Sequence, residues 1–198
     1  MIDDSNKVPH FKVVVLGNSG CGKTSMIIRW ITDQFSRETK PTIGSNHQRK
    51  RVNLNHGPVD LFVWDTAGQE QFQALMPLYT RSSTLGIITC AINDLQSFES
   101  IPKWISIIKN ACDPPPPMIL AVNKIDISDG NAYTIEKIHS EYDPLFKCIY
   151  FVSALSGENI NTLFVSAAEE AYGFAGNNVP NVKIDNTKRS SSSQSSCC

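Results

Sequence analysis

The stretch Gly17-Asn18-Ser19-Gly20-Cys21-Gly22-Lys23-Thr24 decides the fold class of this chain. It matches G-x-x-x-x-G-K-[ST], with an apolar run at residues 11–16 before it and a helix-prone segment at residues 25–31 after it. In this context the glycines let the backbone aim its N–H groups at phosphates, and the following helix N-terminus adds positive charge. The stretch predicts a phosphate-binding loop, with Lys23 at the β- and γ-phosphates and the Thr24 hydroxyl on Mg²⁺. An ordinary glycine-rich turn is the alternative, which the complete pattern disfavours.

The composition limits the class of protein. The chain of 198 residues carries 18 Lys and Arg against 19 Asp and Glu, a balance that excludes a strong general attraction to nucleic acid or to membranes. Its length suits one domain with a tail. No apolar run approaches the ~20 residues of a membrane-spanning helix, and the first residues lack the pattern of a signal peptide. We therefore expect a cytosolic protein that does not bind nucleic acid.

The cysteines are scattered without the C-x-x-C spacing of metal sites, and a cytosolic chain keeps them reduced. Cys21 stands at an expected helix N-terminus, a position that can lower the pKa of a thiol and make it a redox switch. The simpler interpretation is that Cys21 is a small residue tolerated in the loop.

Five runs rich in β-branched and other apolar residues predict the strands of a sheet. They are residues 11–16, 59–64, 85–91, 118–122 and 148–152. Each run is almost continuously apolar, which suits a strand buried on both faces. Helical patterns lie between several of the runs, and this alternation indicates an α/β fold with a mostly parallel, doubly wound sheet.

Two helices and an edge hairpin complete the expected elements. An apolar stripe at residues 160–172 predicts one helix. A second stripe at residues 98–108 contains Pro102, so that helix should kink or start late. Residues 49–55 lead through His56-Gly57-Pro58 into the strand at 59–64, which indicates an antiparallel hairpin at one edge. The apolar pattern stops after Tyr172, and the Gly-, Asn-, Pro- and Ser-rich remainder predicts a disordered tail.

The segment Asp65-Thr66-Ala67-Gly68-Gln69-Glu70 directly follows an expected strand. A carboxylate at a strand end beside a phosphate-binding loop is suited to hold a water on Mg²⁺, the role expected for Asp65. Gly68 permits close approach of its N–H to the γ-phosphate, and Gln69 can orient an attacking water because its amide both donates and accepts hydrogen bonds. A simple turn that ends the strand is the alternative, which the phosphate-binding loop disfavours.

The segment Asn123-Lys124-Ile125-Asp126 follows the strand at 118–122 and points to guanine. A carboxylate accepts two parallel hydrogen bonds, and the guanine edge offers N1–H and N2–H₂ side by side, so Asp126 would reject adenine. Such a site can discriminate by ~10⁴–10⁵. Asn123 would reach guanine N7 or tie the two loops together, and the Lys124 stem would cover one base face. Alone, such a segment is more often a solvated turn.

A weaker signal comes from Ser153-Ala154-Leu155, which follows the last expected strand. A backbone N–H there, that of Ala154, is expected to donate to guanine O6. This interpretation is accepted only together with the guanine-binding role expected for Asp126.

In this order the motifs resemble those of the Ras superfamily of small GTPases. Trp64-Asp65-Thr66-Ala67-Gly68-Gln69-Glu70 and the final Cys197-Cys198 are similar to the Rab family within it. The resemblance covers residues 11–172. It implies a P-loop small G domain with a six-stranded, mostly parallel sheet flanked by helices on both faces. The implied organisation is a flexible N-terminus at residues 1–9, a G domain at 10–173 and a disordered tail at 174–198.

The resemblance also implies site residues that the pattern alone does not. Pro41-Thr42-Ile43-Gly44 is similar to the core of switch I, where Thr42 ligates Mg²⁺ and contacts the γ-phosphate through its backbone. Phe35 matches the aromatic residue that packs against the base, and Ser19 stands where many Rab proteins have serine. Mg²⁺ would be held by Thr24, Thr42 and, through water, Asp65. The residues expected to contact GTP or GDP are Ser19, Gly20, Cys21, Gly22, Lys23, Thr24, Ser25, Phe35, Thr42, Gly68, Asn123, Lys124, Asp126, Ser153, Ala154 and Leu155.

The chain departs from the Rab pattern where partners dock. Rab proteins usually continue with Val-Asp-Phe after switch I, whereas this chain has Ser45-Asn46-His47. Beyond Gln69-Glu70 the family tends to have arginines and a Tyr-Tyr-Arg-Gly-Ala segment, which residues 71–83 lack. The nucleotide residues are intact, so the departures concern effectors, the exchange factor, the activating protein and the shared carriers. The chain resembles a divergent Rab protein.

The last residues, Ser195-Ser196-Cys197-Cys198, do not fit C-a-a-X but match the double-cysteine ending of Rab proteins. That ending implies geranylgeranyl groups on Cys197 and Cys198, prenylation and GDI-type carriers, and the cytosolic face of an intracellular membrane. Two lipid chains anchor stably where one does not. Two exposed thiols of no consequence are the alternative.

The expected mechanism is a monomeric GTP/GDP switch in vesicle trafficking. Gln69 positions water for in-line attack on the γ-phosphate, while Lys23 and loop N–H groups stabilise the developing charge. No arginine finger is identified in the sequence, so intrinsic hydrolysis should be slow, and an activating protein that supplies an arginine should raise it by ~10³–10⁵. After hydrolysis both switch segments loosen and effectors leave. The alternatives are a P-loop phosphotransferase, which would need an arginine-rich lid, and a nucleotide-binding trafficking scaffold with little or no hydrolysis.

Overall fold

A six-stranded sheet in the order β2-β3-β1-β4-β5-β6 forms the centre of the protein in the computed structural model, which describes residues 8–37, 42–127 and 133–178. All neighbouring strands are parallel except β2 and β3, which form an antiparallel hairpin. The strands are β1 (His10–Leu16), β2 (Ser45–Leu54), β3 (Gly57–Thr66), β4 (Leu85–Ala91), β5 (Met118–Asn123) and β6 (Cys148–Phe151). The expected mostly parallel sheet and edge hairpin are confirmed.

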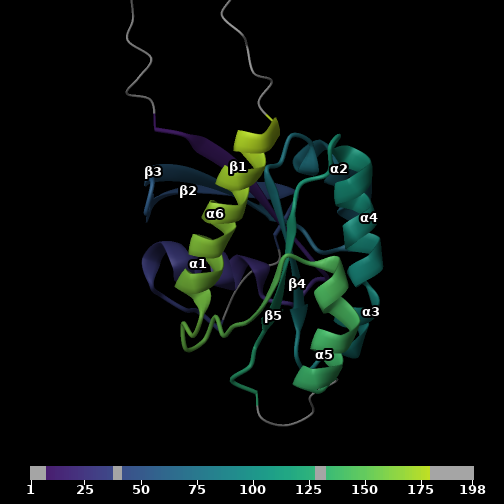
Figure 1. Cartoon of the computed structure of the whole chain (residues 1–198). Coiled ribbons are helices and arrows are strands. Elements are labelled where there is room, and N and C mark those ends of the chain that lie inside the picture. Colours follow the sequence, from purple (N-terminus) through teal and green to yellow (C-terminus); the bar gives the residue numbers. More distant parts are fainter. Residues whose placement is uncertain (1–7, 38–41, 128–132, 179–198) are drawn as a thin grey trace, which may run out of the picture.

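Helices cover both faces of this sheet, as Figure 1 shows with α1 and α6 on one side and α3, α4 and α5 on the other. The α-helices are α1 (Lys23–Thr32), α2 (Met76–Thr80), α3 (Leu95–Glu99), α4 (Ile101–Ala111), α5 (Ile135–Tyr142) and α6 (Ile160–Asn178). Two 3-10 helices, η2 (Glu70–Leu75) and η3 (Asp143–Leu145), precede α2 and follow α5.

Each face of the sheet has its own apolar core. Successive side chains of β1 point to opposite faces of the sheet and so belong to different cores. Val13 and Val15 pack with α1 and α6, whereas Val14 and Leu16 pack with α3, α4 and α5. Every residue of β4 and β5 is buried, which accounts for their continuously apolar sequences. The central strands are therefore fixed from both sides, and the loops at their ends are held in place.

Pro102 has the effect that the sequence predicts. The apolar stripe at residues 98–108 is divided at Ser100 into α3 and α4, with Pro102 in the first turn of α4. Proline is tolerated there because the first N–H groups of a helix have no partner within it. The helix thus starts late instead of running through.

The last helix is longer than its sequence pattern indicates. The expected domain ends at residue 173 and the tail begins at 174, but α6 continues through Gly173 and Gly176 to Asn178. Ala175 packs against the core four residues beyond Ala171, so the apolar stripe extends one more turn and offsets the low helix propensity of the glycines. The helix therefore extends into the expected tail as far as Asn178; residues 1–7 and 179–198 lie outside the described residues.

Candidate functional site

A cavity of about 400 Å³ opens at the carboxyl ends of the parallel strands, where α/β folds commonly bind ligands. The loop before α1, the segment after α1 and the loops after β3, β5 and β6 surround it. Its lining contains Ser19, Gly20, Gly22, Lys23, Thr24, Ser25, Phe35, Ser36, Arg37, Thr42, Thr66, Gly68, Gln69, Asn123, Lys124, Asp126, Ala154 and Leu155. The four motifs, far apart in the sequence, therefore meet around one cavity.

The loop between β1 and α1 has the backbone that a phosphate cradle needs. Gly20 and Gly22 have φ angles of 81° and 87°, and Gly22 caps the N-terminus of α1. The Lys23 ammonium donates to the carbonyl oxygens of Gly17 (2.9 Å) and Asn18 (2.8 Å), which holds it over the loop. Burial lowers the pKa of Lys23, against the attraction of Asp65. Gly20, Gly22 and the cation of Lys23 thus line the cavity together at the N-terminus of α1, which suits an anion.

Gly68 lies directly against this loop. A Cβ atom at Gly68 would come within 2.6 Å of the Gly17 carbonyl oxygen and would also overlap the backbone of Asn18 and Ser19. Only glycine fits this approach, so the expected proximity of residue 68 to the phosphate-binding loop is present. Gln69 follows and also lines the cavity.

Three oxygen-bearing side chains from separate segments meet at one point. The Thr24 hydroxyl donates to Asp65 Oδ2 at 2.7 Å and lies 2.9 Å from the Thr42 hydroxyl. Thr42 also donates to Asp65 Oδ2, at 3.2 Å. These are the three expected Mg²⁺ residues, and they link the start of α1, the segment before β2 and the end of β3.

The residues at this point fit Mg²⁺. Mg²⁺ prefers oxygen ligands and usually keeps several waters, so two hydroxyls and one carboxylate suffice beside phosphates. Asp65 Oδ1 is buried and has no hydrogen-bond partner, and burial raises the pKa of Asp65. An acceptor left unpaired in this way is suited to a metal-bound water. Among the described residues, no group of three His, Cys, Asp or Glu could form an alternative metal centre.

The base-binding end is a hydrogen-bonded set across two loops. Asn123 donates through Nδ2 to the Cys21 carbonyl (2.8 Å) and accepts at Oδ1 from the Ala154 N–H (3.1 Å). Of the two roles expected for Asn123, tying the loops together is therefore present. The Ala154 N–H, expected to face guanine O6, has Asn123 as its partner here.

The residue that orients Asp126 is Ser153, which is not part of the cavity lining. Ser153 is fully buried and its hydroxyl donates to Asp126 Oδ1, while the N–H of Ser156 donates to the Ser153 hydroxyl at 3.1 Å. Ser153, expected to contact the nucleotide, thus lies behind the lining, where its hydroxyl orients Asp126. Lys124 lies between Asn123 and Asp126 with φ of 68°, an uncommon conformation for lysine that turns the chain along the cavity.

Cys21 also stands behind the cavity. Its side chain is fully buried, and burial raises the pKa of its thiol above the usual value despite the nearby Lys23. The redox alternative, which requires an exposed thiol of low pKa, is contradicted. Cys21 is a small buried residue that contributes a carbonyl to Asn123.

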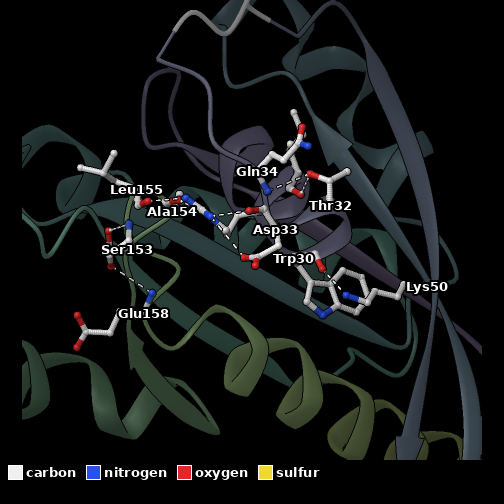
Figure 2. Close-up of polar contacts among 12 residues, drawn as sticks. Trp30, Thr32, Asp33, Gln34, Lys50, Ser153, Ala154, Leu155 and Glu158 are labelled. Carbon is white, nitrogen blue, oxygen red and sulfur yellow. Dashed lines mark hydrogen bonds and ion pairs between the residues drawn. The ribbon is translucent and has the colours of Figure 1, made fainter.

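Sequence patterns did not indicate several residues around the site. Arg29 of α1 donates to the carbonyl oxygens of Ala154 (2.9 Å) and Leu155 (2.5 Å) and so holds the loop after β6. Figure 2 shows Ala154 and Leu155 beside the end of α1, near Asp33. Ser36 and Arg37 line the cavity, and their only sequence signal is that they follow Phe35.

The fold and this cavity define the class of P-loop nucleotide-binding proteins. The sequence matches the Ras family over residues 12–173. It is also 33% identical over 171 residues to "Ras-related protein RABF2a" of Arabidopsis thaliana, across 85% of this chain and 84% of that protein. The chain belongs to the Ras family and, within it, to the Rab proteins, and it is a small GTPase that binds and hydrolyses GTP. No helix in the described part of the chain is long and apolar enough to cross a membrane.

Proposed function

We propose that this chain is a Rab-type switch of vesicle trafficking that hydrolyses its GTP slowly and recruits effectors to a membrane while GTP is bound. The observation that carries this proposal is the meeting of Thr24, Thr42 and Asp65. The Thr24 and Thr42 hydroxyl oxygens lie 2.9 Å apart, and they lie 2.7 Å and 3.2 Å, respectively, from Asp65 Oδ2. Binding of one nucleotide with its metal would therefore shift the conformation of the segments that carry Thr42 and Asp65. Switches that respond to a bound phosphate work in this way.

The roles of the site residues follow from their positions. Thr24 and Thr42 would hold Mg²⁺ directly and Asp65 through water. Bound Mg²⁺ would neutralise charge on the phosphates as the γ-phosphoryl group leaves. Lys23, whose ammonium donates to the carbonyls of Gly17 and Asn18, would turn toward the β- and γ-phosphates. Gln69 would orient the attacking water.

The base is selected at the other end of the cavity. Asp126, oriented by the Ser153 hydroxyl, would accept from the two donors of the guanine edge. Phe35 is half-buried against the core beside α1 and lines the cavity, so its ring is available to the base. Ala154 and Leu155 are held by Arg29, which keeps this wall in place while nucleotides exchange.

The membrane anchor is proposed to lie at the opposite end of the molecule. The chain returns along α6 from the carboxyl end of β6, so the end of α6 lies beside the start of β1, whereas the cavity lies at the carboxyl ends of the strands (Figure 1). Cys198 is 20 residues beyond Asn178. Prenyl groups on Cys197 and Cys198 would hold the chain to a membrane through the intervening segment, which leaves the two switch segments accessible to partners.

The test is hydrogen–deuterium exchange on the full chain loaded with GDP or with a non-hydrolysable GTP analogue. The backbone amides around Thr42 and Gly68 should exchange more slowly with the analogue, while β5, buried throughout, should not change. Equal exchange around both residues in the two states would contradict the switch. The prenylation of Cys197 and Cys198 is tested separately by mass spectrometry of protein expressed in eukaryotic cells.

A further inference from the structure

We propose that Arg29 is a positioning residue that joins the two sides of the base-binding end of the cavity and so sets how firmly guanine is held. The inference rests on the proposed function, because it takes the base to lie between Asp126 and Phe35. One side is the turn after α1 that leads to Phe35, and the other is the loop after β6 with Ala154 and Leu155. Phe35, Ala154 and Leu155 all line the cavity.

The guanidinium of Arg29 reaches both sides at once. Its Nε donates to the Ala154 carbonyl at 2.9 Å and its Nη2 to the Leu155 carbonyl at 2.5 Å. Its Nη1 donates to the Asp33 carbonyl at 2.7 Å. Figure 2 shows Ala154 and Leu155 on one side of these contacts and Asp33 on the other. All three nitrogen atoms are therefore engaged with backbone oxygens, and these belong to two segments that lie far apart in the sequence.

This arrangement is part of the packing of the protein. The Arg29 side chain is only 15% exposed, although it is charged. The loop after β6 also packs along its stem, since a Cβ atom at Gly157 would contact Arg29 Cδ at 3.6 Å. A planar guanidinium with fixed donor directions can serve three carbonyls at once, which the single ammonium nitrogen of lysine cannot do in the same geometry.

The contact that holds the turn after α1 is the one to the Asp33 carbonyl. Arg29 Nη1 also lies 3.4 Å from Asp33 Oδ1, but the Asp33 side chain is 95% exposed, and ion pairs with such exposed groups contribute little. The carbonyl contact instead fixes the backbone where α1 ends. Asp33 has a φ of 56°, and its own N–H donates to the Arg29 carbonyl at 2.9 Å. Phe35 follows two residues later, so its position depends on this turn.

The contacts to the loop after β6 determine where its amide groups point. The Ala154 N–H donates to Asn123 Oδ1 at 3.1 Å while its carbonyl accepts from Arg29, so Ala154 is held on both sides. In a trans peptide the carbonyl of one residue and the N–H of the next point in opposite directions. The Leu155 N–H therefore points away from Arg29, and it has no hydrogen-bond partner within the described part of the chain. Arg29 thus orients a donor that is available to an oxygen of the base.

Helix α1 is the common support of the two sides. It begins at Lys23 in the phosphate-binding loop and carries Arg29 near its other end. Both sides of the base-binding end are therefore fixed relative to the phosphates through one side chain. We expect guanine to leave faster, and its O6 to be recognised less strictly, when the guanidinium is removed. A residue that only stabilises the fold would not change which base is preferred.

The test compares Arg29→Gln with the wild type, on the full chain with Mg²⁺. Release of fluorescent GDP should be about tenfold faster or more, because hydrogen bonds from a charged donor are lost. Competition between GDP and 6-thio-GDP reports on the base. The analogue keeps both donors that Asp126 would accept from but replaces O6 with sulfur, a weak acceptor. The wild type should prefer GDP, and Arg29→Gln should show a smaller preference. Arg29→Lys, which keeps the charge without the planar group, should resemble Arg29→Gln.

Two matched controls change other groups at the end of α1. Lys50→Met removes the ammonium that donates to the Trp30 carbonyl and keeps the stem beside the Trp30 ring. Asp33→Asn removes only the exposed carboxylate and keeps the carbonyl, in a conformation that asparagine tolerates. Both variants should release GDP at the wild-type rate and prefer GDP over 6-thio-GDP as the wild type does.

The outcomes separate this inference from its alternatives. Faster release with an unchanged preference for GDP would mean that Arg29 only stabilises the fold, and would overturn the proposal. Wild-type release by Arg29→Gln, or equal effects of Lys50→Met, would overturn it as well. Asp126→Asn, measured beside them, tests the proposed function: if it retains wild-type GDP affinity, the base placement and this inference both fail. If it loses GDP affinity while Arg29→Gln behaves as wild type, only this inference fails.

Discussion

The indole N–H of Trp104 on α4 donates to Asn18 Oδ1 at 3.0 Å, which connects the phosphate-binding loop to the helices on one face of the sheet. Asn18 Nδ2 donates to the Ser100 hydroxyl at 2.9 Å and to the Gln96 carbonyl at 3.3 Å. The same residue accepts from Lys23 through its backbone carbonyl. The phosphate-binding loop is therefore anchored at the break between α3 and α4. Because Pro102 lies at the start of α4, the helix start that it imposes also affects the position of this loop.

Removing the Trp104 donor should loosen the loop. Trp104→Phe leaves the Asn18 acceptor unpaired, at a cost of about 1–3 kcal/mol, and GDP should dissociate faster. Trp30→Phe is the matched control, because Trp30 is also buried but packs on Phe164 in the other core. Both variants should lower stability, and only the Trp104 variant should speed the release of fluorescent GDP. Equal release rates would mean that Trp104 has only a packing role.

The Thr24 hydroxyl should make nucleotide retention depend on Mg²⁺. In the wild type, chelation of Mg²⁺ should speed GDP release by about tenfold or more, since the metal neutralises phosphate charge. Thr24→Val keeps the shape but removes the hydroxyl, so its release should be fast with or without Mg²⁺. Thr24→Ser, which keeps the hydroxyl, should behave as wild type. A valine variant that still responds to chelation would remove Thr24 from the metal site.

Replacement of Asp126 should change the preferred base. Asp126→Asn offers one acceptor and one donor to an edge with two donors, so affinity for GDP should fall by a factor on the order of 10⁴. Xanthosine diphosphate, whose 2-carbonyl can accept from the new amide, should bind the variant better than it binds the wild type. Titration calorimetry with both nucleotides checks this. Unchanged GDP affinity would show that Asp126 does not contact the base.

Arg51 and Arg49, which both donate to the Asp60 carboxylate, should make stability depend on pH in acid. The pKa of Asp60 is lowered from 3.8 to about 2 in the folded chain, so its contribution is fully present above pH 3.8 and is lost as pH falls toward 2. Urea unfolding of Asp60→Asn should therefore show a smaller loss of stability across this window than the wild type. Glu99→Gln, which removes an exposed carboxyl elsewhere, is the control. Identical pH profiles for wild type and Asp60→Asn would contradict the pairing.

Sequence alone predicts most of this fold because its signals are local. The expected strand at residues 85–91 coincides with β4, whose every side chain is buried, and Pro102 marks the start of α4 correctly. The motif residues around the cavity are similarly predictable, because each follows a strand and parallel strands end at one edge. The motif pattern and the sheet topology therefore both locate the site at the carboxyl ends of the parallel strands.

The contacts that hold the motifs in position are not predictable in this way. Asn18 occupies a variable position of the loop pattern, and nothing in its neighbours indicates Trp104, which lies 86 residues away. Arg29 looks like an ordinary charged residue of an amphipathic helix, yet it holds the carbonyls of Ala154 and Leu155. Both are long-range polar pairings that only the packed structure defines. The burial that raises the pKa of the Cys21 thiol also depends on the packed structure, so the sequence around Cys21 does not indicate it.

The central claim, that Gln69 orients the attacking water in a slow GTPase switch, is tested most directly by single-turnover hydrolysis of bound GTP. The wild type with Mg²⁺ should turn over on the order of 10⁻⁴–10⁻³ s⁻¹, as expected without an arginine finger. Gln69→Leu should be about tenfold slower or more while it retains wild-type GTP affinity, since the side chain acts on water and not on nucleotide binding. Hydrolysis by Gln69→Leu at the wild-type rate would contradict the account.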